Sequence, residues 1–259
     1  MNGPRAAGRE RLEGHNRSQK AYYGSGVRKR MVPADTRYLQ RQIGELLQFA
    51  GVRPDDDILE VGCGMGRYTL PLAARGFNIE GLDLSPYLLD RLREFDGGRS
   101  GVPLHCADLI DFPAGLAGRF DAVIGFFMLH HVHDLKLCFA AMSRMLKPSG
   151  RIAFLEPNPL HPGYYAQVTL SPGMTWKGDG GILRMRPARV MGAMQAAGFT
   201  DMRMRRFGFF PPLLANAGWG ARLEALLERM PAGKPFQAFQ LFTASAGSQN
   251  ASPDEASAP

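Results

Sequence analysis

The amino-acid sequence predicts an α/β fold: a doubly wound, mostly parallel sheet of seven strands, with an irregular insertion after the fifth strand. Three observations support this fold class. Short apolar runs alternate with segments of helical periodicity from residue 35 onward. The run at 120–127 is almost continuously apolar, as expected for a strand covered by helices on both faces. A glycine-rich turn joins the first apolar run to the helical segment that follows it.

The expected elements follow one another in the order that this fold requires. Strands are predicted at 58–61, 78–82, 102–106, 120–127, 151–155, 201–209 and 236–244, and helices at 35–50, 68–74, 86–95, 135–146, 187–197 and 219–230. In the first helix, apolar residues from Leu39 to Ala50 recur at helical spacing, and Asp35 is the expected N-cap. Such alternation predicts a parallel sheet with helices on both faces.

A single domain is predicted over residues 19–245, because 259 residues with 45% hydrophobic content can form one sizeable core. Residues 1–18 are expected to be a disordered basic arm and 246–259 a disordered tail, since both are rich in small and polar residues. The insertion at 157–186 contains several prolines, glycines and aromatic residues, which predicts a lid over a functional site.

The composition favours a cytoplasmic protein. The sequence has no apolar run of about eighteen residues and no secretory signal in its polar N-terminal part, so no transmembrane segment is expected. The three cysteines, Cys63, Cys106 and Cys138, lie far apart and lack the spacing of metal ligands. We therefore expect free thiols in a reducing compartment and no bound metal.

The formal net charge of +7 is concentrated near the N-terminus, where residues 5–45 contain ten Lys or Arg against four Asp or Glu. Two interpretations remain open. Either this part attracts an acidic partner, such as nucleic acid, anionic lipid or a phosphorylated substrate, or it is only a solvated surface segment.

The strongest functional signal is the turn after the first strand, which reads EVGCGMG at residues 60–66. Glycines at such a turn allow the backbone to bend tightly and a ligand to approach closely. The helix that follows offers free N–H groups at its N-terminus. The turn therefore predicts a nucleotide- or carboxylate-binding loop, and its place between a strand and a helix is the context that this function requires.

Two carboxylates follow the next two strands. Asp83 ends the second strand, where it can accept hydrogen bonds from both hydroxyls of a ribose, with a helix N-cap as the structural alternative. Asp108 follows the third strand, where it either meets the exocyclic amine of adenine or closes a turn. Together they predict a ligand that contains adenosine.

The loop discriminates against NAD. In the dinucleotide fingerprint G-x-G-x-x-G, counted from Gly62 and Gly64, the third glycine would fall at Arg67, but here it falls at Gly66. The acidic Glu60 before the loop suits a sulfonium ligand with a free ammonium group better than a pyrophosphate. An NAD or nucleotide-sugar enzyme is therefore disfavoured.

Several segments, in combination, resemble the motifs of class I S-adenosylmethionine (SAM)-dependent methyltransferases over about residues 35–156. They are DILEVGCGMG at 57–66, GLDLS at 81–85, FDAV at 120–123, MLHHV at 128–132 and RMLKPSG at 144–150. They look like motif I, the acidic loop, the fourth-strand region and the R-x-L-K-P-G-G turn, the last with Ser149 in place of a glycine. The general resemblance is to the small-molecule branch (methyltransferase type 11) that includes ubiquinone-biosynthesis enzymes.

This resemblance implies a Rossmann-like methyltransferase fold, SAM as the methyl donor and no metal. The residues expected to bind the donor are Glu60, Gly62, Cys63, Gly64, Gly66, Asp83, Leu84, Asp108, Leu109 and Phe126. The acceptor is expected to be a small molecule: a metabolite, a quinone-like compound or a lipid-linked compound, methylated on O, N or C.

Methyl transfer requires an aligned nucleophile and, where the acceptor keeps its proton, a general base. By resemblance, the first residue of the pair His130 and His131 faces the acceptor, which makes His130 the candidate base. Glu156, at the end of the fifth strand, is expected to orient the acceptor or to close a turn. The aromatic residues expected to cover the site are Tyr22, Tyr23, Tyr164, Tyr165 and Trp176.

Two classes of nucleic-acid methylation are disfavoured. The sequence GFFM at 125–128 stands where DNA and glutamine N-methyltransferases have N/D-P-P-Y, and neither Cys106 nor Cys138 has the context of a cytosine C5 nucleophile. An RNA methyltransferase and a non-catalytic SAM-binding protein remain as alternatives, although nucleic acid is not the expected partner.

The apolar segment at 207–214 also has two interpretations. Six arginines lie near it in sequence, at Arg184, Arg186, Arg189, Arg203, Arg205 and Arg206. An apolar rim with arginines fits a lipid-linked or phosphorylated acceptor, or anionic lipid, at a membrane surface. The alternative is a core strand and a buried turn, with the arginines on the solvent side.

Overall fold

The computed structural model describes residues 14–19, 21, 23, 24, 26, 31–170, 176 and 180–247. The disorder expected at 1–13 and 248–259 lies outside the described residues. Within them, residues 14–18 of the expected disordered arm are helical instead, in a helical segment that ends at residue 19, because His15 and Asn16 find partners on the body of the protein. Ala246, expected to begin the disordered tail, is the last residue of a strand.

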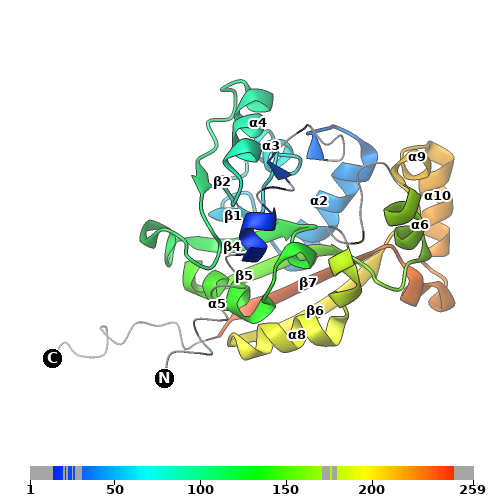
Figure 1. The fold of residues 1–259 in the computed structure, drawn as a ribbon. Coiled ribbons are helices and arrows are strands. Elements are labelled where there is room, and N and C mark those ends of the chain that lie inside the picture. The colour runs from blue at the N-terminus through cyan, green and yellow to red at the C-terminus, as the bar shows by residue number, and fades with distance from the viewer. Residues whose placement is uncertain are drawn as a thin grey trace.

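A seven-stranded sheet forms the centre of the molecule, in the order β3-β2-β1-β4-β5-β7-β6 (Figure 1). The strands are β1 (Ile58–Val61), β2 (Ile79–Asp83), β3 (Leu104–Cys106), β4 (Phe120–Phe126), β5 (Leu146–Pro157), β6 (Phe199–Phe207) and β7 (Phe239–Ala246). The first five strands pair in parallel, and β7 runs antiparallel to both β5 and β6. The predicted fold class is therefore confirmed.

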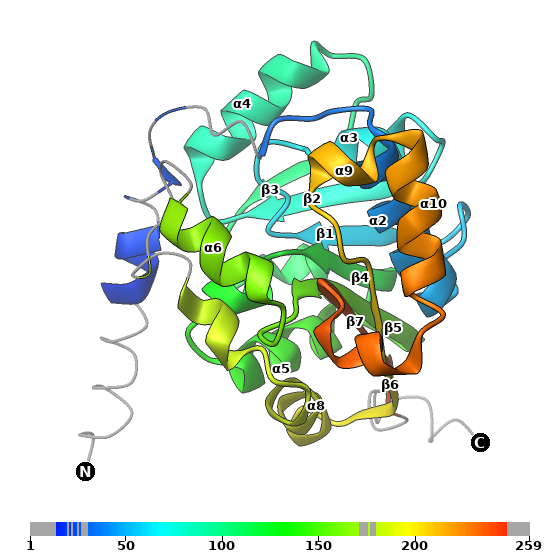
Figure 2. The ribbon, with the colours of Figure 1, turned by 90° about the vertical axis from the view of Figure 1, so that its right-hand side faces the viewer.

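Helices cover both faces of this sheet (Figures 1 and 2). They include α2 (Arg37–Ala50), α3 (Thr69–Ala73), α4 (Pro86–Asp96), α5 (Leu135–Met145), α6 (Pro162–Leu170), α8 (Pro187–Ala196), α9 (Pro212–Ala215) and α10 (Gly218–Leu227). One hydrophobic cluster joins α5 and α8 to the sheet, and a second joins α2 and α3 to it. None of the helices in the described part of the chain is long and apolar enough to cross a membrane.

Two predicted boundaries shift for identifiable reasons. Helix α2 is capped by Thr36 and not by Asp35, because the Thr36 hydroxyl accepts a hydrogen bond from the Leu39 N–H at 3.3 Å. Strand β5 begins at Leu146, which pairs with Phe120, five residues before the predicted start at residue 151. Residues 147–150, which were expected to form a turn, are therefore part of β5, and the pairing of β5 with β4 is irregular there.

The insertion after β5 is more regular than expected. Residues 162–170 form helix α6, and Gly180–Arg184 form a short 3-10 helix, η4. Pro162 is compatible with helix because it stands at the first helical position, where its missing N–H has no intrahelical partner to lose. Apart from Trp176, residues 171–179 of the predicted lid lie outside the described part of the chain.

Candidate functional site

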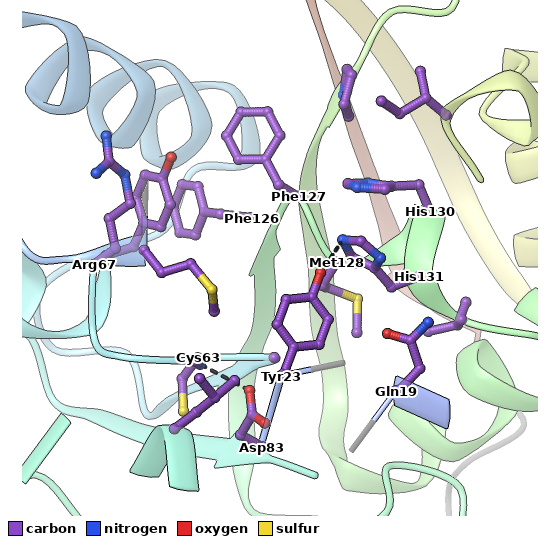
Figure 3. A pocket seen from close by; sticks show the side chains of 18 of the residues that line it. Gln19, Tyr23, Cys63, Arg67, Asp83, Phe126, Phe127, Met128, His130 and His131 are labelled. Atoms are coloured by element: carbon purple, nitrogen blue, oxygen red, sulfur yellow. Dashed lines mark hydrogen bonds between the residues drawn. The ribbon is translucent and has the colours of Figure 1, made fainter. Parts of the chain in front are cut away.

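A cavity of about 780 Å³ lies at the carboxyl ends of β1, β2 and β4. In parallel α/β sheets this edge is where ligands bind. Ten of the twelve predicted site residues line the cavity: Glu60, Gly62, Cys63, Gly64, Asp83, Leu84, Asp108, Leu109, Phe126 and His130. The two that do not are Gly66 and Glu156. The structure thus brings together side chains from four separate strand ends (Figure 3).

The glycine-rich turn has the backbone conformation that only glycine adopts freely. Gly62, Gly64 and Gly66 have φ angles of 71°, 55° and 81°. A Cβ atom on Gly62 would lie 2.9 Å from Cβ of Met128, so a side chain there would close the gap between two cavity walls. A Cβ on Gly66 would instead meet Leu92 at 2.8 Å, which explains why Gly66 packs the turn against α4 without lining the cavity.

Asp83 fixes this turn and faces the cavity. One carboxylate oxygen accepts a hydrogen bond from the Gly64 N–H at 2.9 Å, and the other accepts one from the Ser85 N–H at 2.8 Å. Ser85, and not Asp83, caps helix α4. Each oxygen keeps a further lone pair, so the carboxylate can also accept from two ribose hydroxyls. Burial raises the pKa of Asp83.

Glu60 is a second buried carboxylate in the same wall. Its oxygen accepts a hydrogen bond from the Thr69 hydroxyl at 2.7 Å, and among the described residues no cation pairs with it. Burial raises the pKa of Glu60 from its usual 4.5 to about 8. A buried carboxylate without a cation is costly in the unliganded protein, and a ligand that carries positive charge would offset this cost.

The Glu60→Gln variant is expected to be more stable than the unmodified protein at high pH. Between pH 4.5 and about 8 the folded protein holds a proton on Glu60 that the unfolded chain releases, so stability falls as the pH rises. The substitution removes this dependence. Its advantage in free energy of unfolding is expected to grow from near zero at pH 4.5 to about 2–4 kcal/mol at pH 8. Urea denaturation at several pH values measures it.

The exposed Glu94→Gln serves as the control, since it removes a carboxylate of α4 that is not buried. An equal gain in both variants, or no change with pH in Glu60→Gln, would contradict the assignment of this pH dependence to Glu60.

The N-terminal helical segment lies against the end of the cavity near Asp108. The Asn16 side-chain amide donates a hydrogen bond to one carboxylate oxygen of Asp108, and the Ile110 N–H donates to the other at 3.0 Å. His15 Nε2 lies 2.7 Å from the His131 carbonyl oxygen, and the Tyr23 hydroxyl lies 3.0 Å from His131 Nε2. The Asn16 amide thus occupies the position on Asp108 that was predicted for the adenine amine.

If Asn16 competes with adenine for Asp108, the Asn16→Ala variant will bind an adenosine ligand more tightly. One hydrogen bond of this kind is worth about 1 kcal/mol net, so the Kd for SAM is expected to fall about fivefold. Isothermal titration measures this, with the exposed neighbour Arg17→Ala as the control. A weaker affinity would instead place Asn16 among the groups that hold the ligand.

His130 and Glu156 form a buried pair in the cavity wall. Nδ1 of His130 lies 2.7 Å from one Glu156 carboxylate oxygen, and the other oxygen accepts a hydrogen bond from the Leu129 N–H at 2.6 Å. Glu156 is fully buried, so it cannot touch an acceptor, and its predicted role in orienting the acceptor directly is corrected. A carboxylate only accepts hydrogen bonds, so Nδ1 carries the ring proton and Nε2 keeps a free lone pair.

Gly181, which sequence analysis did not identify, packs against the backbone of His130. A Cβ atom on Gly181, in η4, would lie 1.8 Å from the His130 carbonyl oxygen. The described end of the insertion therefore packs directly on the backbone of His130, and a residue larger than glycine would displace one or the other.

The opposite wall is aromatic. Phe126 stacks on Tyr68, with ring centroids 4.0 Å apart and an interplanar angle of 5°. The Tyr68 hydroxyl donates a hydrogen bond at 2.8 Å to the buried side chain of Gln42. Phe127 has a φ of 55°, unusual for a bulky residue, and its ring contacts Phe239. Phe126 thus belongs to this aromatic wall (Figure 3) and lies in a different core cluster from Leu109.

Of the aromatic residues expected to cover the site, Tyr23 and Tyr164 line the cavity. Tyr165 and Trp176 contact one another at the surface, and Tyr22 lies outside the described residues. Sequence reasoning missed His15, Asn16, Gln19, Tyr38, Gln42 and Tyr68. One signal was present: Gln42 is a polar residue on the apolar face of its helix.

The segment at 207–214 is part of the site, but the arginines predicted beside it are not all there. Residues 209–212 line the cavity. Arg203 and Arg205, however, lie over the ring of Phe49 on α2, and Arg205 pairs with Glu45. Strand alternation turns these two arginines toward α2 and away from the cavity, so they do not contribute to the charged rim of the first interpretation.

Comparison with known proteins matches part of the chain to a family of known fold and chemistry. Residues 59–154 match the model of a family described as methyltransferase domain. A ubiquinone biosynthesis O-methyltransferase of Aromatoleum aromaticum is 37% identical over 103 residues, which are 39% of this chain and 44% of that relative. One of Chromobacterium violaceum is 36% identical over the same shares. The chain therefore matches less than half the length of these curated relatives.

Solved structures with the same fold bind SAM or its product. Phosphoethanolamine N-methyltransferase 2 of Haemonchus contortus, in complex with SAM, superposes with a TM-score of 0.60 and 17% identity, over 80% of this chain and 52% of that one. Geranyl diphosphate C-methyltransferase of Streptomyces coelicolor, in complex with S-adenosylhomocysteine, gives a TM-score of 0.59 and 17% identity, over 90% and 98%. At these identities the likeness shows the fold.

Proposed function

We propose that this chain is a Rossmann-like SAM-dependent methyltransferase, which transfers a methyl group from SAM to a small-molecule acceptor with an aromatic or otherwise apolar body. One observation carries the proposal: a single cavity joins a donor half, built on the glycine-rich turn and Asp83, to a half that holds the His130–Glu156 pair and the aromatic wall.

The residues present fit SAM. Asp83 has free lone pairs for two ribose hydroxyls, and Gly62 leaves a gap that any side chain would fill. Glu60 is a buried carboxylate that lacks a described cation, which suits a ligand with a sulfonium and an ammonium group. Leu84 and Leu109 offer apolar contact for adenine. No group of His, Cys, Asp or Glu among the described residues has the arrangement of a metal site.

When bound, SAM supplies an activated methyl group and a good leaving group. The protein has to align the acceptor, exclude water and remove a proton where the acceptor keeps one. His130 takes the proton on Nε2, because Nδ1 is engaged by Glu156. Glu156 acts as a positioning residue: it holds the ring in one orientation and stabilises the imidazolium that forms. The acceptor oxygen then carries the electron pair that forms the new bond to carbon.

The acceptor class that fits best is a phenol or quinol methylated on oxygen. The aromatic wall of Phe126, Tyr68 and Phe127 offers stacking surfaces to a planar ring. A base across the cavity from this wall is useful for an acceptor with an acidic hydroxyl. The curated relatives are named for O-methylation in ubiquinone biosynthesis, which supports the same class. We propose further that the acceptor carries an apolar lipid tail.

The test is isothermal titration of the purified protein with SAM, S-adenosylhomocysteine and NAD, followed by a screen of phenols and quinols for formation of S-adenosylhomocysteine. Binding of the two SAM species but not NAD, with turnover on a phenolic acceptor, is the expected result. Binding of NAD instead would overturn the donor assignment. Binding of SAM without turnover on any acceptor would favour a non-catalytic SAM-binding protein.

A further inference from the structure

Helix α10 has its polar and apolar sides reversed relative to an ordinary surface helix. Glu224 is 3% exposed and, with Glu228, turns inward to pair with Arg41 of α2. Glu224 also accepts hydrogen bonds from the N–H groups of Phe209 and Phe210. The carboxylates of this helix therefore fasten it to the body of the protein.

The outward side of α10 is apolar. Trp219, Leu223 and Leu226 recur at helical spacing and are 62%, 40% and 58% exposed, and Met230 continues the stripe just beyond the helix. Leu213 of α9, 84% exposed, adds to it. A contiguous group of large apolar side chains left in water marks an interaction site.

The exposed charges of this segment all have the same sign. Between residues 209 and 236, which the structure describes completely, the exposed charged side chains are Arg222, Arg229 and Lys234. Arg222 and Arg229 stand next to the apolar stripe, and both carboxylates of α10 point the other way. An amphipathic helix with Trp and Leu flanked only by cations is typical of binding to an anionic lipid interface.

The apolar surface is continuous with the mouth of the cavity. Pro211 and Pro212, which lead into α9, line the cavity, and so does Leu170, which is largely exposed at the end of α6. Figure 2 shows α9 next to α10, with α6 apart from them on the same side of the molecule.

We infer that the surface formed by Leu170, Leu213, Trp219, Leu223, Leu226 and Met230, with Arg222 and Arg229, docks on an anionic membrane surface. Docked in this way, the protein would receive a lipid-embedded acceptor through the mouth beside Pro211. The delivery step rests on the proposed methyltransferase function, whereas the docking itself does not. A second copy of the chain fits less well, because a two-fold contact would bring together two surfaces whose exposed charges in this segment are all positive.

Co-sedimentation with vesicles tests the docking. The full chain is mixed with vesicles of phosphatidylcholine alone or of phosphatidylcholine with phosphatidylglycerol, at low and high salt. We expect binding to the anionic vesicles that weakens with salt, because the cations contribute electrostatically. In a Trp176→Phe background, Trp219 fluorescence is expected to shift to shorter wavelength on binding. Absence of binding to both kinds of vesicle would overturn the inference.

Matched variants locate the surface. Leu226→Gln is expected to lower partitioning about tenfold, and Arg222→Ser with Arg229→Ser to lower it about fivefold for each arginine. One control is Leu137→Gln, which changes an exposed leucine of α5, and the other is Arg75→Ser with Arg99→Ser, which removes two exposed arginines elsewhere. Both controls should bind vesicles as the unmodified protein does. Equal losses in variants and controls would overturn the assignment to α10.

Sedimentation equilibrium and titration with SAM complete the test. Self-association that is lost in Leu226→Gln, with no vesicle binding, would assign the surface to a second copy. All the surface variants are expected to keep their affinity for SAM and their turnover of a water-soluble acceptor. Loss of vesicle binding would thus overturn the docking without affecting the methyltransferase proposal. Absence of SAM binding would overturn the methyltransferase proposal without affecting the docking.

Discussion

The His130→Ala variant is expected to lower kcat for a phenolic acceptor by about 100- to 10,000-fold, while the Kd for SAM stays unchanged. The imidazole is the only side chain in the cavity wall whose ring nitrogen is oriented by a fully buried carboxylate among the described residues. Because the base acts only in the transition state, kcat and kcat/KM should fall together. Steady-state formation of S-adenosylhomocysteine measures both quantities.

Glu156→Gln distinguishes a base from a structural histidine. The Leu129 N–H and His130 Nδ1–H both donate to Glu156. A glutamine has only one oxygen, so it can accept from only one of them. If that oxygen serves Leu129, the amide must donate to Nδ1, and the ring proton moves to Nε2. A loss of activity close to that of His130→Ala is then expected, with a native thermal transition and normal SAM binding.

An acceptor that loses no proton would behave differently. With a soft nucleophile such as a thiolate, His130→Ala should then retain nearly full activity. Full activity toward a phenol in both variants would assign the pair a purely structural role. Alignment of the acceptor with the methyl group would then account for the rate of methyl transfer.

The donor half of the site could be predicted from the sequence because its residues are local to strand ends. The EVGCGMG turn and Asp83 each follow an apolar run directly, so a correct strand prediction also placed these side chains at one sheet edge. The same alternation predicted a parallel sheet covered by helices, whereas the insertion of β7 between β5 and β6 is seen only in the structure. The predicted features depend on short-range backbone geometry, which sequence patterns record well.

The rest of the site depends on contacts between distant parts of the chain. Asn16 reaches Asp108 across 92 positions, and α10 is reversed because Arg41 of α2 binds Glu224 across 183. No local sequence pattern indicates which residue pairs with Asn16 or with Arg41. Glu156 was expected to orient the acceptor or to close a turn because it ends a strand, but pairing of β5 with β4 and β7 buries that position behind His130.

The Asp83→Ala variant is expected to weaken binding of SAM and of S-adenosylhomocysteine by at least about 100-fold. Two hydrogen bonds from ribose hydroxyls to a buried carboxylate are each worth about 1.5–3 kcal/mol. The same substitution leaves the N–H groups of Gly64 and Ser85 without their acceptor, so some loss of stability is expected as well. Titration at a temperature well below the thermal transition separates the two effects.

Asp83→Asn and Asp90→Ala make this result specific. Asparagine keeps one oxygen, which one backbone N–H can use, but it removes the negative charge; an intermediate loss of affinity is expected. Asp90 lies exposed on α4, where it pairs with Arg93, and its replacement should leave binding unchanged. If Asp83→Ala lost stability but kept its affinity for SAM, the role of the carboxylate would be only to stabilise the glycine-rich turn. The ribose would then have to be held by the backbone groups around Leu84.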